Sequence, residues 1–133
     1  MTKILVVEDE SDIRNFVVKA LTAKGYKVFE ASNGYEGWHL LQKVKPDIVI
    51  LDIMMPVMDG MEVLKKIREH PEFKEMPVIM LTGKSEDKDI LEGYSVGADY
   101  YITKPFDIKT VLIGVKMMLE DKEKKDRKEY EIK

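Results

Sequence analysis

Five short runs of apolar, mostly β-branched residues alternate along the chain with longer segments that have the spacing of amphipathic helices. The runs ILVV and IVIL are apolar at consecutive positions, which is typical of strands buried on both faces. Such strands occur in parallel sheets that helices cover on both sides. The alternation therefore predicts an α/β domain, a doubly wound five-stranded parallel sheet with five helices.

The predicted strands are residues 4–7, 27–30, 47–51, 77–81 and 100–103. Apolar residues three and four positions apart predict the helices. These residues are Ile13, Phe16, Val17, Ala20 and Leu21 for the first helix; Trp38, Leu41 and Val44 for the second; Val63, Leu64 and Ile67 for the third; Ile90, Leu91 and Tyr94 for the fourth; and Ile108, Val111, Leu112, Val115 and Leu119 for the fifth. Gly25 is the expected stop of the first helix, Asn33-Gly34 the entry to the second and Asp59 the N-cap of the third.

Length and charge narrow the possible functions. A chain of 133 residues makes one ordinary domain, and a net charge of −3 offers no basic surface for nucleic acid. No apolar run is long enough to span a bilayer, and the absence of cysteine excludes disulfides and thiolate metal sites. We expect a cytoplasmic domain over residues 1–121, followed by a charged helical extension or tail over 122–133. That tail is either a solvated, fraying helix end or a truncated linker to an output domain.

Side chains that can carry chemistry gather at the predicted strand ends. Glu8 and Asp9 follow the first strand, Asp52 the third, Thr82 the fourth and Lys104 the fifth. These ends meet at one edge of a parallel sheet, where ligands of doubly wound folds bind. Each residue alone has an ordinary explanation, such as a helix cap or a turn. Three carboxylates placed together, however, need a physical reason to be there.

A divalent cation supplies that reason. Three neighbouring carboxylates repel one another, and Mg²⁺ is a hard ion that binds carboxylate and phosphate oxygens. Lys104 adds a second positive charge aimed at an anion, and Thr82 offers a hydroxyl hydrogen bond. Together these residues predict a site in which Asp52 carries a phosphoryl group whose oxygens are neutralised by Mg²⁺ and Lys104.

Four stretches of the chain carry a family resemblance: KILVVEDE, PDIVILDIMMPVMDG, PVIMLTG and GADYYITKPF. They resemble the receiver domains of response regulators in two-component signalling, which share the flavodoxin-like fold of the chemotaxis regulators. The resemblance covers residues from about 3 to 119 and implies the strand order 2-1-3-4-5.

The resemblance also implies roles for individual residues. Asp52 would accept a phosphoryl group from the phosphohistidine of a sensor histidine kinase or phosphotransfer protein. Glu8, Asp9, Asp52 and the backbone carbonyl of Met54 would hold Mg²⁺, and Lys104 would contact the phosphoryl group. Such a domain is not an enzyme with a separate substrate, since it catalyses only its own phosphoryl transfer and slow autodephosphorylation.

The output of the switch is also implied by the resemblance. Thr82 would move toward the phosphoryl group and Tyr101 would turn inward. This change would alter the face formed by helix 4, strand 5 and helix 5, which includes Tyr94. A downstream protein partner would bind that face, without direct binding to nucleic acid or membrane.

Three other functions fit the sequence less well. A phosphatase of the haloacid dehalogenase type needs a second Asp two residues after its nucleophile, and that position holds Met54. A flavodoxin-like electron carrier needs a phosphate-binding loop after the first strand, where Glu8 and Asp9 would repel a phosphate. A scaffold that has lost phosphorylation would normally lack the Asp, Thr or Lys, and all are present here.

Overall fold

A computed structural model of the chain describes residues 1–83 and 96–132, with the side chains of the last helix described through residue 126. The strands are β1 (Lys3–Val7), β2 (Lys27–Ala31), β3 (Ile48–Asp52), β4 (Val78–Thr82) and β5 (Tyr100–Thr103). The helices are α1 (Ser11–Ala23), α2 (Gly34–Val44), α3 (Gly60–Glu69) and α5 (Ile108–Ile132). The helix predicted around Ile90, Leu91 and Tyr94 lies outside the described residues.

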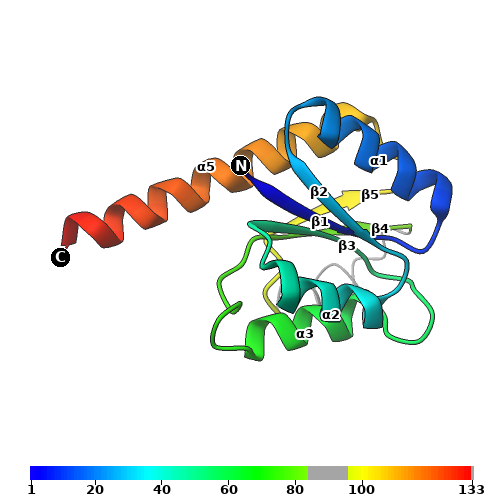
Figure 1. Ribbon diagram of the computed structural model, residues 1–133, viewed down its shortest axis with the longest axis horizontal. Helices are drawn as coiled ribbons and strands as arrows, with labels where there is room; N and C mark the ends of the chain where they lie inside the picture. The colour runs from blue at the N-terminus through cyan, green and yellow to red at the C-terminus, as the bar shows by residue number, and fades with distance from the viewer. Residues whose placement is uncertain (84–95, 133) are drawn as a thin grey trace.

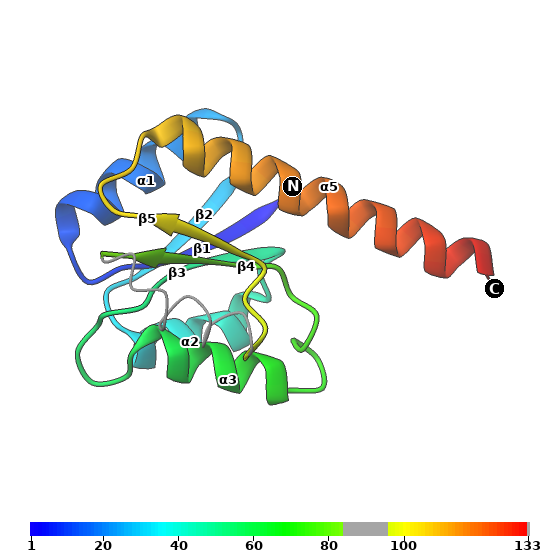
Figure 2. The same ribbon diagram turned by 180° about the vertical axis from the view of Figure 1, so that it is seen from behind.

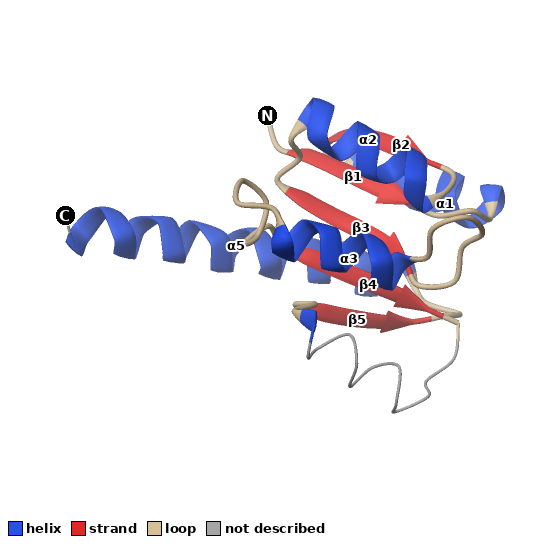
Figure 3. Ribbon diagram, turned by 90° about the horizontal axis from the view of Figure 1, so that it is seen from below, coloured by secondary structure: helices blue, strands red, loops and turns tan. Residues whose placement is uncertain are grey.

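The five strands form one parallel sheet in the order β2-β1-β3-β4-β5, which confirms the predicted topology (Figure 3). Helices α1 and α5 cover one face of the sheet and α2 and α3 cover the other (Figures 1 and 2). Alternate side chains of β1 enter the two layers: Leu5 and Val7 pack on the α2 and α3 side, and Ile4 and Val6 on the α1 and α5 side. The consecutive apolar runs are therefore explained by burial on both faces.

The predicted helix boundaries are confirmed by the backbone. Gly25 follows the C-cap of α1 with a φ of 93°, a conformation that glycine adopts at little cost. The side chain of Asn33 accepts a hydrogen bond from the backbone N–H of Glu36 at 2.8 Å, and Asp59 accepts from that of Glu62 at 3.0 Å. These two N-caps start α2 and α3 next to the edge where the strands end.

The helix predicted from the spacing of Ile13, Phe16, Val17, Ala20 and Leu21 is confirmed as α1, but these residues are not equally buried. Its side chain is 51% exposed, whereas Val17 and Leu21 are fully buried. Successive residues of a helix are about 100° apart, so one stripe cannot bury Phe16 and Val17 equally. The stripe that packs on the sheet is centred on Val17 and Leu21.

Gly37 and Trp38 show how closely α2 packs on the sheet. A Cβ at position 37 would lie 2.8 Å from both methyl groups of Val7, so only glycine fits there without a shift of the helix. Trp38 is half-buried at the margin of the core. Its ring makes edge contacts with the rings of His70 and Phe73.

Helix α5 continues to Ile132 and projects beyond the rest of the domain (Figure 1). Its first half packs on the sheet through Val111 and Val115, and further along Lys122 pairs with Asp47 at 3.3 Å. Within the described residues, no helix is both long and apolar enough to cross a membrane.

The loop between β3 and α3 contains a strained turn. Val57 has a φ of 71°, and the backbone N–H of Met58 donates to the carbonyl of Pro56 at 2.8 Å, which closes a three-residue γ-turn. A β-branched residue rarely adopts this conformation. The Val57 side chain is 86% exposed, so it gains little packing in return.

Replacing Val57 with Gly should therefore stabilise the protein by about 0.5–1 kcal/mol, because relief of the strain exceeds the added entropy of the unfolded chain. Urea denaturation would measure this difference. Val57→Ala is the matched control, since it keeps a Cβ in the strained conformation. Equal stability of the two variants would show that the turn stores no strain.

Candidate functional site

Three carboxylates meet at the edge where β1 and β3 end. Glu8 and Asp9 follow β1, and Asp52 is the last residue of β3. Each offers an oxygen atom that lies within 4.8 Å of the others. Glu8 and Asp52 are buried, with 0% and 2% of their surface exposed, while Asp9 reaches solvent. The structure thus brings together the acidic residues that the strand ends predicted.

Lys104 lies among these carboxylates. Its Nζ is 2.6 Å from Glu8 Oε1, 3.4 Å from Asp52 Oδ2 and 3.7 Å from Glu10 Oε1. The Lys104 backbone N–H donates to the carbonyl of Thr82, and the peptide bond to Pro105 is cis. The ammonium therefore enters the acidic cluster from the end of β5.

Burial and crowding set the protonation of the cluster. Burial, hydrogen bonding to Glu8 and the charge of Glu8 raise the pKa of Asp52 to about 8, although Lys104 opposes this shift. Burial works against the ionised form of Asp9, but hydrogen bonding with Asp52 and Glu8 lowers the pKa of Asp9 below its usual value. Burial likewise disfavours the charged form of Lys104, but Glu8 and Asp52 raise its pKa. Without a cation, the cluster therefore shares a proton at neutral pH.

The donor set suits a hard divalent cation. Glu8 Oε1 is buried and has no hydrogen bond of normal geometry, although the Lys104 ammonium touches it. A carboxylate oxygen can accept more than one partner, so Glu8 Oε1 can still bind another ligand. All the available donors are oxygens, as Mg²⁺ prefers. Glu8, Asp9 and Asp52 therefore fit a magnesium ion.

The loop after β3 packs against the backbone of Asp52 and donates a hydrogen bond to its carboxylate. A Cβ at Gly60 would overlap the backbone carbonyl of Asp52, so glycine allows α3 to begin directly against the strand end. The backbone N–H of Met54 donates to Asp52 Oδ1 at 3.4 Å, and the Met54 side chain is 73% exposed. The role predicted for the Met54 carbonyl as a metal ligand stays a prediction.

Thr82 and Tyr101 lie on the neighbouring strands β4 and β5. Thr82 is the last residue of β4 and is buried, with 4% exposed. Tyr101 lies in β5 opposite Met80 of β4 and is half-buried against the core on the α2 and α3 side. Their predicted roles as a switch stay predictions.

Two residues near the site were missed in the sequence. Glu10 lies 3.7 Å from Lys104, and its place directly after Glu8-Asp9 was a signal that could have found it. Arg14 donates to the backbone carbonyl of Glu8 at 2.8 Å. No motif marks Arg14, because its partner is a main-chain atom.

The raised pKa of Asp52 makes the metal-free protein sensitive to pH. The folded state holds a proton on Asp52 up to about pH 8, whereas the unfolded chain loses it near the ordinary value of 3.8. Stability should therefore be greatest at low pH within this window and fall as the pH rises from about 5 to about 8, by up to roughly 1.4 kcal/mol per unit.

Thermal melts in chelator across this range would measure the effect. Calorimetry in buffers of different ionisation enthalpy should also detect a proton released on Mg²⁺ binding below about pH 8. Stability that rises with pH across the window, or binding without proton release, would contradict a protonated Asp52.

Comparisons with known proteins agree with this geometry. The profile of the response regulator receiver domain matches residues 4–116. The transcriptional regulatory protein SrrA of Staphylococcus aureus is 42% identical over 117 residues, which cover 88% of this chain and 47% of that protein. The chain thus spans about half the length of the curated relatives it matches.

Solved structures give the same result. The chemotaxis response regulator CheY4 of Vibrio cholerae superposes with a TM-score of 0.84 at 36% identity, covering 89% of this chain and 98% of that one. A CheY-like receiver domain protein of Methanospirillum hungatei superposes with a TM-score of 0.88 at 30% identity, covering 94% and 98% of the two chains. Fold, site and sequence therefore agree that this chain belongs to the receiver domains of two-component response regulators.

Proposed function

We propose that the chain is a switch activated by phosphorylation of Asp52, with the phosphoryl group coming from the phosphohistidine of a sensor histidine kinase or phosphotransfer protein. The observation that carries this proposal is the carboxylate cluster of Glu8, Asp9 and Asp52, two of them buried, with the Lys104 ammonium among them. A group of like charges this close is suited to a metal and an incoming anion rather than to stability alone.

Each residue has a part in the transfer. Glu8, Asp9, Asp52 and the Met54 carbonyl would hold Mg²⁺, which would neutralise charge on the phosphoryl oxygens. A carboxylate oxygen of Asp52 attacks phosphorus as the bond to the donor nitrogen breaks. Lys104 then exchanges carboxylate contacts for a contact with the phosphoryl group. The chain acts on its own Asp52 and slowly loses the phosphoryl group again, so it is not an enzyme with a separate substrate.

Phosphorylation would be read through Thr82 and Tyr101. The buried Thr82 hydroxyl is on the strand between Asp52 and β5, so a shift toward the phosphoryl group changes the packing available to Tyr101. The output surface would be the face of β5, α5 and the preceding segment, part of which lies outside the described residues. Its partner would be a downstream protein in the cytoplasm, and the naming of SrrA as a transcriptional regulatory protein is consistent with such an output.

The test is to incubate the purified chain with acetyl phosphate and Mg²⁺ and to measure the intact mass. We expect one phosphoryl group on wild type with Mg²⁺ and none in excess chelator. Thr82→Ala should still accept it but should lose the change in hydrogen exchange of β5 that wild type shows. Labelling that is equal in chelator would rule out the metal site, and an unaltered β5 response in Thr82→Ala would rule out the switch.

A further inference from the structure

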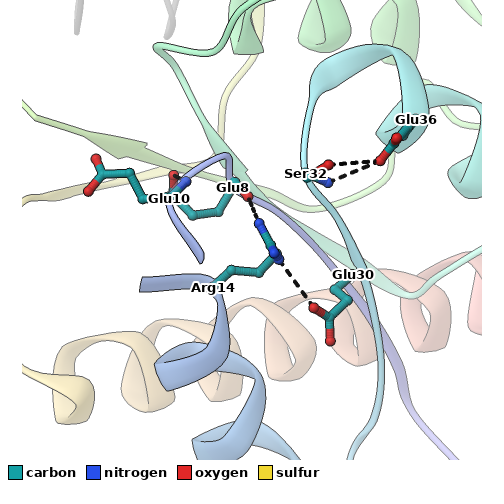
Figure 4. A network of polar contacts seen from close by, with 6 residues as sticks. All are labelled: Glu8, Glu10, Arg14, Glu30, Ser32 and Glu36. Atoms are coloured by element: carbon teal, nitrogen blue, oxygen red, sulfur yellow. Dashed lines mark hydrogen bonds and ion pairs between the residues drawn. The ribbon is translucent and has the colours of Figure 1, made fainter. Parts of the chain in front are cut away.

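The turn that carries Glu8 and Asp9 is held by a side chain from another element. Arg14 of α1 donates from one terminal nitrogen to the backbone carbonyl of Glu8 at 2.8 Å (Figure 4). Its Nε donates to Glu30 Oε1 at 3.2 Å, and Glu30 belongs to the edge strand β2. One guanidinium thus joins α1, β2 and the residue that follows β1.

The hydrogen bond from Arg14 to the Glu8 carbonyl takes the place of a main-chain hydrogen bond that the sheet does not supply. The β1–β2 ladder ends with the pair Val7 and Ala31, and the backbone N–H of Glu8 still donates to the carbonyl of Ala31 at 3.1 Å. The Glu8 carbonyl lies beyond the ladder in a residue with no exposed surface, where an unsatisfied acceptor would be costly. Arg14 satisfies it and so extends the hold on Glu8 by one peptide.

The Glu8 carboxylate is fixed from the other side. The backbone N–H of Glu10 donates to Glu8 Oε2 at 3.2 Å (Figure 4). Glu8 Oε1 lies 2.6 Å from Lys104 Nζ. The peptide groups on both sides of Asp9 therefore belong to one hydrogen-bonded turn. A rotation of the Glu8 peptide would move both carboxylates relative to Asp52.

We infer that Arg14, anchored by Glu30, is a positioning residue for the divalent cation: it sets the geometry of Glu8 and Asp9 without touching the metal. The guanidinium side chain is largely buried at 17% exposure, whereas Glu30 is 47% exposed. Arg14 is therefore the fixed element, and Glu30 restrains which way its planar group points. This inference rests on the proposed function, because it requires that the cluster bind Mg²⁺.

The test is calorimetric titration of the intact chain with MgCl₂ alone, at a temperature where every variant is folded. Arg14→Met removes the donors but keeps the length of the side chain, and it should weaken Mg²⁺ binding about tenfold, as loss of a supporting contact does at other metal sites. Glu30→Gln keeps Arg14 and releases its anchor, so its Kd should lie between those of wild type and Arg14→Met. Arg14→Lys should recover part of the affinity, since an ammonium reaches one acceptor but not both.

Glu72→Gln is the matched control. Glu72 is 49% exposed and pairs with Lys45 at 2.8 Å, so the change in charge and exposure equals that of Glu30→Gln away from the β1–α1 turn. Its Kd for Mg²⁺ should equal that of wild type. The melting temperature of each variant in chelator measures its stability without metal, so an effect on Mg²⁺ binding can be told apart from a general loss of stability.

If Arg14→Met melts lower but binds Mg²⁺ within twofold of wild type, Arg14 is merely structural and the inference is wrong. If Glu72→Gln weakens binding as much as Glu30→Gln, the effect is one of net charge and the inference is again wrong. If wild type itself does not bind Mg²⁺, the proposed function fails, and the inference fails with it.

Discussion

Asp52→Asn is expected to abolish phosphoryl incorporation from acetyl phosphate and from any histidine kinase that acts on the chain. An amide is not a nucleophile toward phosphorus, and no other carboxylate of the cluster is both buried and at the end of β3. The same substitution should remove most of the pH dependence of the metal-free protein, because it removes the carboxyl whose pKa is raised to about 8. Intact mass and thermal melts measure the two effects.

Asp59→Asn is the matched control for this substitution. Asp59 belongs to the same β3–α3 loop, and Asn caps helices as well as Asp does, so α3 should remain intact. Asp59→Asn should be labelled like wild type. If Asp52→Asn is also labelled, the phosphoryl group is carried elsewhere and Asp52 is not the acceptor.

Arg68→Ala is expected to destabilise the domain by about 3 kcal/mol, because it leaves several acceptors without a donor. Arg68 donates to the carbonyls of Gly97, Lys74 and Met76 at 2.8, 3.1 and 2.7 Å, and pairs with Asp99 at 2.9 Å. One guanidinium therefore ties the end of α3 to the segments that precede β4 and β5. The Asp99 carboxylate also accepts a hydrogen bond from the backbone N–H of Val78 at 2.8 Å. Arg68→Ala would therefore remove the side chain that positions this acceptor.

Urea denaturation measures this loss, and two variants calibrate it. Lys45→Ala removes the cation of an exposed ion pair, whose partners are 60% and 49% exposed, and should cost less than about 1 kcal/mol. Arg68→Lys keeps the charge but cannot form the fork of bonds, so its stability should be intermediate. A loss for Arg68→Ala no larger than that for Lys45→Ala would show that the network contributes little.

The sequence predicts the features of the fold that depend on short-range patterns. Strands buried in a parallel sheet are recognised by consecutive apolar residues, and the helix N-caps by Asn33 and Asp59. The functional side chains can be placed at one edge because each follows or ends a strand. They are Glu8, Asp9, Asp52, Thr82 and Lys104. The predicted bounds match only at β5: β1 begins one residue earlier, β2 ends one residue later, and β3 and β4 both begin and end one residue later, because Asp47 and Pro77 precede their strands. The Asp47 carboxylate instead accepts from the backbone N–H of Lys3 at 2.8 Å.

Contacts between a side chain and a distant main-chain atom cannot be predicted from residue types and their spacing in the sequence. Arg68 and its acceptor Gly97 are 29 residues apart, and the Arg14 contact with Glu8 depends on how α1 turns back over β1. Apolarity alone likewise does not show that Phe16 is exposed while the adjacent Val17 is buried. These interactions require the packed structure.

The projecting half of α5 has a mechanical consequence. Lys122 pairs with Asp47 on the body of the domain, and the helix continues for ten residues beyond it to Ile132, a distance of about 15 Å at 1.5 Å per residue. A helix of that length can act as a lever. If the helix tilts by about 10° at Lys122, its far end moves by roughly 2.6 Å, which is more than one residue's rise. A small tilt of α5 at Lys122 would therefore be magnified at the end of the helix.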